Sequence, residues 1–328
     1  MGKLFIHIGS QKTGSTSIQT FLRNNPEKLA AQGINYVTAG RGPSAHNRVA
    51  TKLGTKPKVA DTMLKNIVSE ISAKPDMTHI LSSELFFSRD WAKKFNLVLP
   101  DDIRAKTGII AYVRRQDKFV ESMYKQVLKK GRFQGSPQDY AAKKLRSLDY
   151  TNTLTPYAQA FGADRIDLCP YERGHFPSGD VVLDFAARIG LTGLGQDDLE
   201  QYHSNVTFSR EVSVMLGQIA QHTDLNVAVL IRALIADNAP EIIQSNDCFT
   251  QTQQREIMAA LEDCNTTLRD TFRPDLDTLF SMSDLADTVP EKTIAPTESL
   301  KRLEAAQTAL LQIIGKTHTS AIIQTPKA

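Results

Sequence analysis

Cysteine and long apolar runs are scarce in this chain of 328 residues. Cys169, Cys248 and Cys264 are odd in number and include no CxxC pair, which excludes a disulfide framework and disfavours a zinc site. The N-terminal apolar run has about five residues, far fewer than the roughly 20 that a membrane span requires. We therefore expect no signal peptide, no membrane span and a cytoplasmic location.

A strong excess of one charge is absent as well. Lys and Arg number 39 against 36 Asp and Glu, for a net charge of +3, so the sequence gives no indication of a nucleic-acid partner. The hydrophobic content of 41% is typical of a globular protein. These values favour a small anionic ligand over a polyanion.

The most informative stretch is residues 3–22, KLFIHIGSQKTGSTSIQTFL. An apolar run typical of a buried strand is followed by a glycine-containing turn and then by a segment with helical apolar spacing. Gly9 and Gly14 give the turn conformational freedom, and Ser15, Thr16 and Ser17 place hydroxyls at the start of the helix. A loop before a helix N-terminus is suited to bind an anion. The alternative is an α/β junction without a ligand.

A lysine is missing where the nucleotide-binding P-loop requires one. Gly9, Gly14 and Thr16 fit the Gly-x-x-x-x-Gly-Lys-Ser/Thr spacing, but position 15 is serine. The nearby cation is Lys12, inside the loop. This displacement argues against a P-loop kinase, which would use ATP and magnesium.

A second motif follows the apolar run from Thr107 to Val113, which predicts another strand. Arg114 stands at its end and Ser122 eight residues later, in a predicted helix. An arginine offers a planar set of donors to a phosphate, and a serine adds a hydroxyl. We expect an apolar stripe of Phe119, Met123 and Val127 to dock this helix.

The two motifs together resemble sulfotransferases that use 3′-phosphoadenosine 5′-phosphosulfate (PAPS), and RRQD at 114–117 with PYER at 170–173 resembles a bacterial group of them. The resemblance implies an α/β fold of the P-loop NTPase-like type, with a central parallel sheet flanked by helices. It implies PAPS as sulfuryl donor, PAP as product and no metal. The donor contacts would be Gly9, Gln11, Lys12, Thr13, Gly14, Ser15, Thr16, Ser17, Arg114 and Ser122.

Two residues are candidates for the general base that removes a proton from the acceptor. Glu84 follows the predicted strand in THILSSELFF, at the sheet edge where Lys12 is also expected. A carboxylate can serve as general base, although Glu84 could instead cap a helix or pair with Lys12. His46 and Arg48, in the polar segment SAHNR, are candidate acceptor-site residues or solvated loop side chains, and His46 is the second candidate base.

We expect a sulfotransferase domain over residues 1–285, with a PAPS-binding core at 1–190 and a helical part at 195–285. A linker, an amphipathic helix and a tail would fill 286–328. That helix would begin at a Thr297 cap and present Leu300, Leu303, Leu310 and Ile314 on one face, for docking or for homo-oligomer formation.

The acceptor is expected to carry a hydroxyl group, as a saccharide or glycolipid does, with an amine as a further option. Two other classes stay open at this stage. One is a small-molecule or nucleotide kinase on the same topology, and the other is a non-catalytic relative that binds a nucleotide or glycan.

Overall fold

The computed structural model describes residues 2–199, 207–237, 242–243, 247–290 and 296–316. The chain forms two compact units, and each is described by itself. The first contains residues 1–115, 149–203 and 261–281, and the second contains residues 116–148, 204–260 and 282–328. The domain boundaries expected from the sequence stay a prediction.

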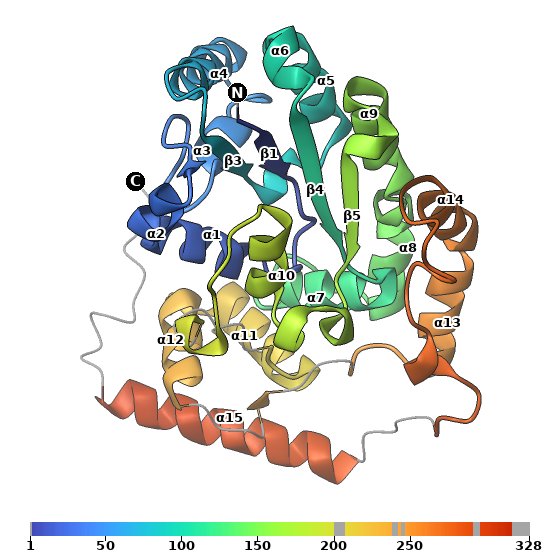
Figure 1. The fold of residues 1–328 in the computed structure, drawn as a ribbon. Helices are drawn as coiled ribbons and strands as arrows, with labels where there is room; N and C mark the ends of the chain where they lie inside the picture. The colour runs from blue at the N-terminus through green and yellow to red at the C-terminus, as the bar shows by residue number, and fades with distance from the viewer. Residues whose placement is uncertain (1, 200–206, 238–241, 244–246, 291–295, 317–328) are drawn as a thin grey trace. The chain divides into compact units, whose positions relative to one another are not determined.

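The first unit is built on a five-stranded sheet in which every pairing is parallel (Figure 1). The strand order is β2-β3-β1-β4-β5. The strands are β1 (Leu4–His7), β2 (Ile34–Tyr36), β3 (Thr78–Ser82), β4 (Thr107–Val113) and β5 (Ile166–Pro170). Most of their side chains are buried, as expected for a sheet that is covered on both faces.

The order of the strands places a topological switch point at β1. From β1 the chain first builds β2 and β3 on one side, and then crosses to build β4 and β5 on the other. In open parallel sheets, ligands bind beyond the carboxyl ends of the strands at such a point. The segments that follow β1, β3 and β4 are therefore the first place to look for a site.

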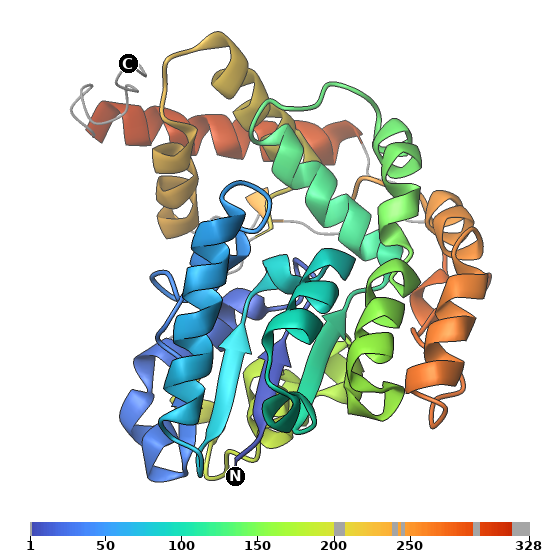
Figure 2. The same cartoon turned by 90° about the horizontal axis from the view of Figure 1, so that it is seen from above.

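Helices cover both faces of this sheet (Figures 1 and 2). One face packs against α1 (Ser15–Asn24), α2 (Pro26–Ala31) and α10 (Val181–Arg188) in a common apolar core. The other face carries α4 (Pro57–Ser72), α5 (Arg89–Val98) and α9 (Thr151–Phe161). Shorter elements are α3 (Asn47–Ala50), a 3-10 turn η1 (Glu84–Phe86) and α6 (Asp101–Arg104), and α14 (Glu262–Phe272) packs on α9 and β5.

The second unit is helical over most of its described residues. Its helices are α7 (Gln116–Leu128), α8 (Pro137–Leu148), α11 (Arg210–His222), α12 (Val227–Asp237), α13 (Gln251–Ala259) and α15 (Pro296–Lys316). Leu216 of α11, Leu230 of α12 and Ala306 of α15 meet in one apolar core. The expected α/β class with a parallel sheet and a mainly helical C-terminal part is confirmed.

The predicted apolar face of α15 is wrong at Leu300 and Leu303 and right at Leu310, and the side chain of Ile314 lies outside the described residues. Leu300 is 56% exposed and Leu303 is 37% exposed, whereas Ala306 and Ala309 are buried beside Leu310. Small side chains let α15 approach α11 and α12 closely, so alanines rather than leucines form most of the contact. The helix also begins at Pro296, a favoured first helical residue, so that Thr297 is not its cap.

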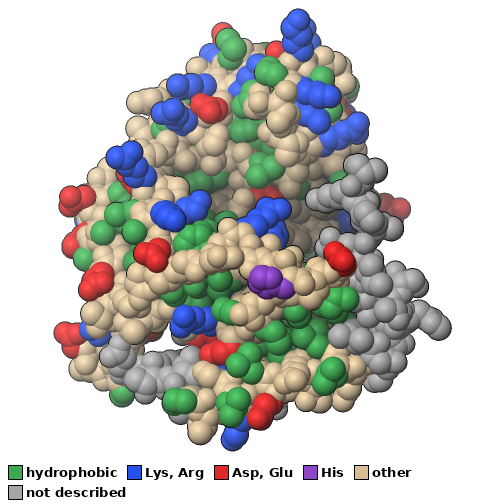
Figure 3. Space-filling model, turned by 180° about the vertical axis from the view of Figure 1, so that it is seen from behind, with side chains coloured by type: hydrophobic (Ala, Val, Ile, Leu, Met, Phe, Trp, Pro, Cys, Tyr) green, Lys and Arg blue, Asp and Glu red, His purple; other side chains and the backbone are tan. Residues whose placement is uncertain are grey.

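Two surface properties agree with the composition. Among the described residues, no helix combines the length and the apolar character needed to cross a lipid bilayer. Side chains of both charges occur on the face that Figure 3 shows.

Candidate functional site: the loop after β1 and the ends of β3 and β4

The loop from Gly9 to Gly14 connects β1 to α1 and bends sharply. Lys12 has a φ of 68° and Gly14 a φ of 73°, both in the left-handed region. Such a conformation is uncommon for a residue other than glycine and costs about 1–2 kcal/mol. A strained, exposed lysine at a switch point is therefore a candidate functional residue.

The start of α1 has no side-chain cap. Gly14 is the N-cap residue, and its carbonyl accepts from the N–H of Ser17 at 2.9 Å and of Ile18 at 3.2 Å. The N–H groups before Ser17 lack an intrahelical partner, as at any helix start. Ser15 is buried beside them, whereas Thr16 is exposed. The sequence predicted the hydroxyls at this helix start but not the absence of a side-chain cap. Such a terminus is suited to hold an anion.

Internal hydrogen bonds hold the loop in place. The hydroxyl of buried Thr13 donates to the carbonyl of Ser10 at 2.5 Å. The N–H of Ser10 donates to the carbonyl of Tyr112 in β4 at 2.8 Å. Gln11 lies in the turn and is partly exposed. The loop is thus joined to the neighbouring strand.

The two loop glycines are required for different reasons. A Cβ at Gly9 would lie 2.7 Å from Nε2 of His7, whereas a Cβ at Gly14 would lie 2.6 Å from Cγ1 of Val181 in α10. Gly14 also needs its positive φ. Close packing around Gly9 and Gly14 therefore leaves no space for a side chain at either position.

Arg114 lies beside the loop, as the resemblance implied. It follows β4, and its Nη1 donates to the carbonyl of Lys12 at 3.2 Å. The hydroxyl of Tyr150 donates to the carbonyl of Arg114 at 2.7 Å and so fixes the backbone there. Its neighbour Arg115 is only 2% exposed and donates to the carbonyl of Ser281 at 2.6 Å, which is a structural role.

Glu84 lies beyond the carboxyl end of β3, next to β1 in the sheet. Its Oε2 accepts from Nε2 of Gln19 in α1 at 3.2 Å, and its Oε1 accepts from Nδ2 of Asn47 in α3 at 3.1 Å. Glu84 also begins η1, where the side chain of Ser83 is the cap. Neither amide partner was predicted from the sequence.

His46 is completely buried, with an exposed fraction of 0%, so it is not a solvated loop side chain. Its Nδ1 accepts from the N–H of Ser82 at 3.1 Å, and its ring packs against Tyr36 and Phe86. Burial lowers the pKa of His46 to about 4, so the ring is neutral near pH 7. These contacts favour a packing role and leave Glu84 as the stronger candidate base. Arg48, two residues on, is exposed.

A second buried histidine, His7, lies at the end of β1. Its Nδ1 is 2.8 Å from Oγ of Ser82, and burial lowers its pKa to about 3. The Nε2 atom is buried and has no hydrogen-bond partner among the described residues. The sequence analysis missed His7 because a single histidine within an apolar run carries no spacing signal.

Ser122 belongs to α7, in the second unit, and is half-buried there. Its role as a phosphate donor stays a prediction. The expected stripe residues Phe119, Met123 and Val127 are only half-buried. The buried positions of α7 are Val120, Glu121, Tyr124, Lys125 and Leu128, together with Gln116 and Asp117. The buried face contains charged residues, which an apolar pattern does not reveal.

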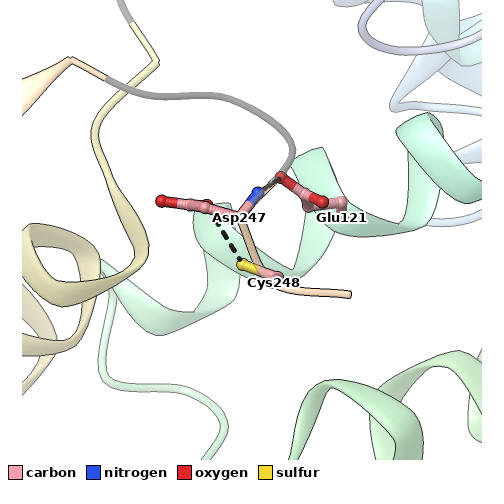
Figure 4. A group of neighbouring side chains, drawn as sticks. All are labelled: Glu121, Asp247 and Cys248. Atoms are coloured by element: carbon pink, nitrogen blue, oxygen red, sulfur yellow. Dashed lines mark hydrogen bonds between the residues drawn. The ribbon is translucent and has the colours of Figure 1, made fainter. Parts of the chain in front are cut away.

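Glu121 of α7 belongs to a cluster with Asp247 and Cys248, which Figure 4 shows. Lys125 is buried against Asp247, and its Nζ lies 3.4 Å from Oε1 of Glu121. Burial raises the pKa values of Glu121 and of the Cys248 thiol. Because the Lys125 ammonium already lies against both carboxylates, the cluster is better described as a buried ion pair than as a metal site.

No protein-family model matches the chain. Over 114 residues, or 34% of its length, the chain is 37% identical to an uncharacterized protein of Archaeoglobus fulgidus, and the aligned part covers only 30% of that relative.

Three solved structures similar to the chain are sulfotransferases, each with a TM-score of 0.38. The first is a sulfotransferase from Alicyclobacillus acidocaldarius, 15% identical, with 69% of this chain and 97% of that chain covered. The others are 13% identical and cover 80% of this chain: the sulfotransferase domain from the curacin biosynthetic pathway, covered to 97%, and that from the Synechococcus PCC 7002 olefin synthase, covered to 94%. Similarity at this level does not determine an activity.

Proposed function

We propose that the chain is a sulfotransferase that transfers the sulfuryl group of PAPS to a hydroxyl acceptor, such as a saccharide or glycolipid. The observation that carries the proposal is the placement of Lys12, Arg114 and Glu84 after three adjacent parallel strands, β1, β4 and β3. Lys12 and Arg114 supply positive charge at an uncapped helix N-terminus, and Glu84 supplies a carboxylate.

The residues of the loop fit a phosphosulfate group by their chemistry. Backbone N–H groups at the start of α1 and the hydroxyls of Ser15, Thr16 and Ser17 are donors, which a tetrahedral anion accepts. Arg114 would bind the 3′-phosphate, with Ser122 as a further donor. Position 15 is serine, where a P-loop kinase has its lysine. We therefore propose a reaction that does not depend on magnesium.

The proposed transfer is an in-line displacement, by analogy with phosphoryl transfer. PAPS supplies the sulfuryl group and leaves as PAP. Glu84 accepts the proton of the attacking hydroxyl while the new O–S bond forms and the bond from sulfur to the bridging oxygen breaks. Lys12 stabilises the negative charge that grows on that bridging oxygen.

The test is incubation of the full chain with ³⁵S-labelled PAPS and a panel of saccharides, glycolipids and phenols, with EDTA present. We expect formation of PAP and labelled acceptor at the same rate with and without EDTA. Absence of PAPS turnover with every acceptor, or phosphoryl transfer from magnesium-ATP instead, would contradict the proposal.

The cytoplasmic location and a homo-oligomer through α15 remain predictions.

A further inference from the structure

Both oxygens of the Glu84 carboxylate are held by side-chain amides. Gln19 donates from Nε2 to Oε2 at 3.2 Å, and Asn47 donates from Nδ2 to Oε1 at 3.1 Å. A carboxylate has about four acceptor positions. Each oxygen of Glu84 therefore keeps a lone pair with which to accept a proton while both amide bonds persist.

A serine sets the orientation of each amide. Nε2 of Gln19 also donates to Oγ of Ser82 at 3.2 Å. Oδ1 of Asn47 accepts from the hydroxyl of Ser83 at 2.5 Å, so its Nδ2 end turns toward Glu84. The two serines that precede Glu84 in the sequence thus orient its two amide partners.

Burial makes this arrangement rigid. Gln19 is 4% exposed, and Ser82 and Ser83 are 0% exposed, so water has little access to the hydrogen bonds between these three side chains. His7 closes the network, with its Nδ1 at 2.8 Å from Oγ of Ser82. Buried polar groups with satisfied hydrogen bonds specify one conformation.

We propose that Gln19 and Asn47 are positioning residues that act through Glu84. Gln19 also connects the general base to the donor loop, because it lies on α1, the helix that follows this loop. The proposal rests on the proposed function. In the transfer, the proton moves from the acceptor hydroxyl to Glu84 as the O–S bond forms and the bond to PAP breaks. The amides hold the carboxylate in the orientation that receives the proton.

The test is a double-mutant cycle on kcat, measured as PAP formed from PAPS with the best acceptor of the panel, or with water as acceptor. Gln19→Met should lower kcat roughly tenfold or more, because misplaced catalytic groups lose rate steeply. In the Glu84→Ala background, Gln19→Met should cause no further loss. The KM for PAPS and the affinity for PAP should stay within about twofold of wild type, since the positioned group is the base.

Asn47→Ala gives a second arm if Gln19→Met fails to fold, because Asn47 is only partly buried. The control is Asn35→Ala, which removes a matched amide donor, from Nδ2 of Asn35 to Oε1 of Glu70 at 3.1 Å, away from the loop. The control should keep kcat within about twofold.

The outcomes separate the two proposals. An equal loss of kcat in the wild-type and Glu84→Ala backgrounds, or no loss in either, overturns the positioning role while transfer by the wild type still supports the proposed function. A wild-type chain that does not turn over PAPS overturns both.

Discussion

Nη1 of Arg114 donates to the backbone carbonyl of Lys12 at 3.2 Å, although the two residues are 102 positions apart in the chain. The bond joins the end of β4 to the loop after β1, and β1 and β4 are paired strands. Lys12 of the first motif and Arg114 of the second thus lie at one corner of the sheet.

Substitution of Lys12 should separate activity from stability. Lys12→Ala and Lys12→Gly should each lower turnover of PAPS roughly 100-fold or more, as expected when a group that stabilises the transition state is lost. Lys12→Gly should also be more stable than Lys12→Ala by up to about 1 kcal/mol, because glycine adopts the positive φ without strain. Urea unfolding and turnover assays check the two parts, and near-normal turnover by either variant would refute the role of Lys12.

The close packing of Gly14 predicts a defect beyond backbone strain. Gly14→Ala meets both a φ of 73° and a contact of 2.6 Å with Val181, whereas Gly33→Ala meets a φ of 70° with no atom within 4 Å. We expect Gly33→Ala to cost about 1 kcal/mol and Gly14→Ala at least 1 kcal/mol more. Thermal unfolding compares them. If the two variants lose the same stability, the loop tolerates a Cβ at position 14, and the expected clash with Val181 is wrong.

Two fully buried histidines, His7 and His46, predict acid sensitivity. The folded pKa values are about 3 for His7 and about 4 for His46, below the unfolded value of 6.5, because burial disfavours the charged rings. The unfolded state therefore binds more protons below pH 6.5, and stability falls as the pH falls from there toward about 4. At pH 5 each histidine should cost about 2 kcal/mol relative to pH 7.5.

Urea unfolding at both pH values tests this expectation. His7→Asn and His46→Asn should lower stability at pH 7.5 but reduce the loss on going to pH 5. His175→Asn, with a side chain that is 56% exposed, should keep the wild-type pH dependence. Equal pH dependence in all four proteins would argue against buried neutral histidines.

Much of the first unit could be predicted from local pattern. The strand at Thr107–Val113 has the predicted bounds, because a continuous apolar run identifies it. The loop after β1 was predicted because its strand, glycines and hydroxyls follow one another directly in the sequence.

The partners of Glu84 could not be predicted in this way. Gln19 is 65 positions from Glu84 and Asn47 is 37 positions away, and both contacts depend on how the strands pair and how α1 and α3 pack. The same holds for the burial of His46. On α7, Glu121 and Lys125 form a buried ion pair. Their i, i+4 spacing is common for ion pairs on helix surfaces, so the sequence did not identify this face of α7 as the buried one.

The most direct test of the central claim is calorimetric titration of the wild-type chain with PAP in the absence of metal, beside ADP with magnesium. The control variant is Arg104→Ala, which removes an arginine that donates to the carbonyl of Asn96 at 2.9 Å, before the other end of β4. We predict metal-independent binding of PAP that Arg114→Ala weakens at least tenfold and Arg104→Ala leaves unchanged. A preference for magnesium-ADP, or equal PAP affinity in wild type and Arg114→Ala, would contradict the account.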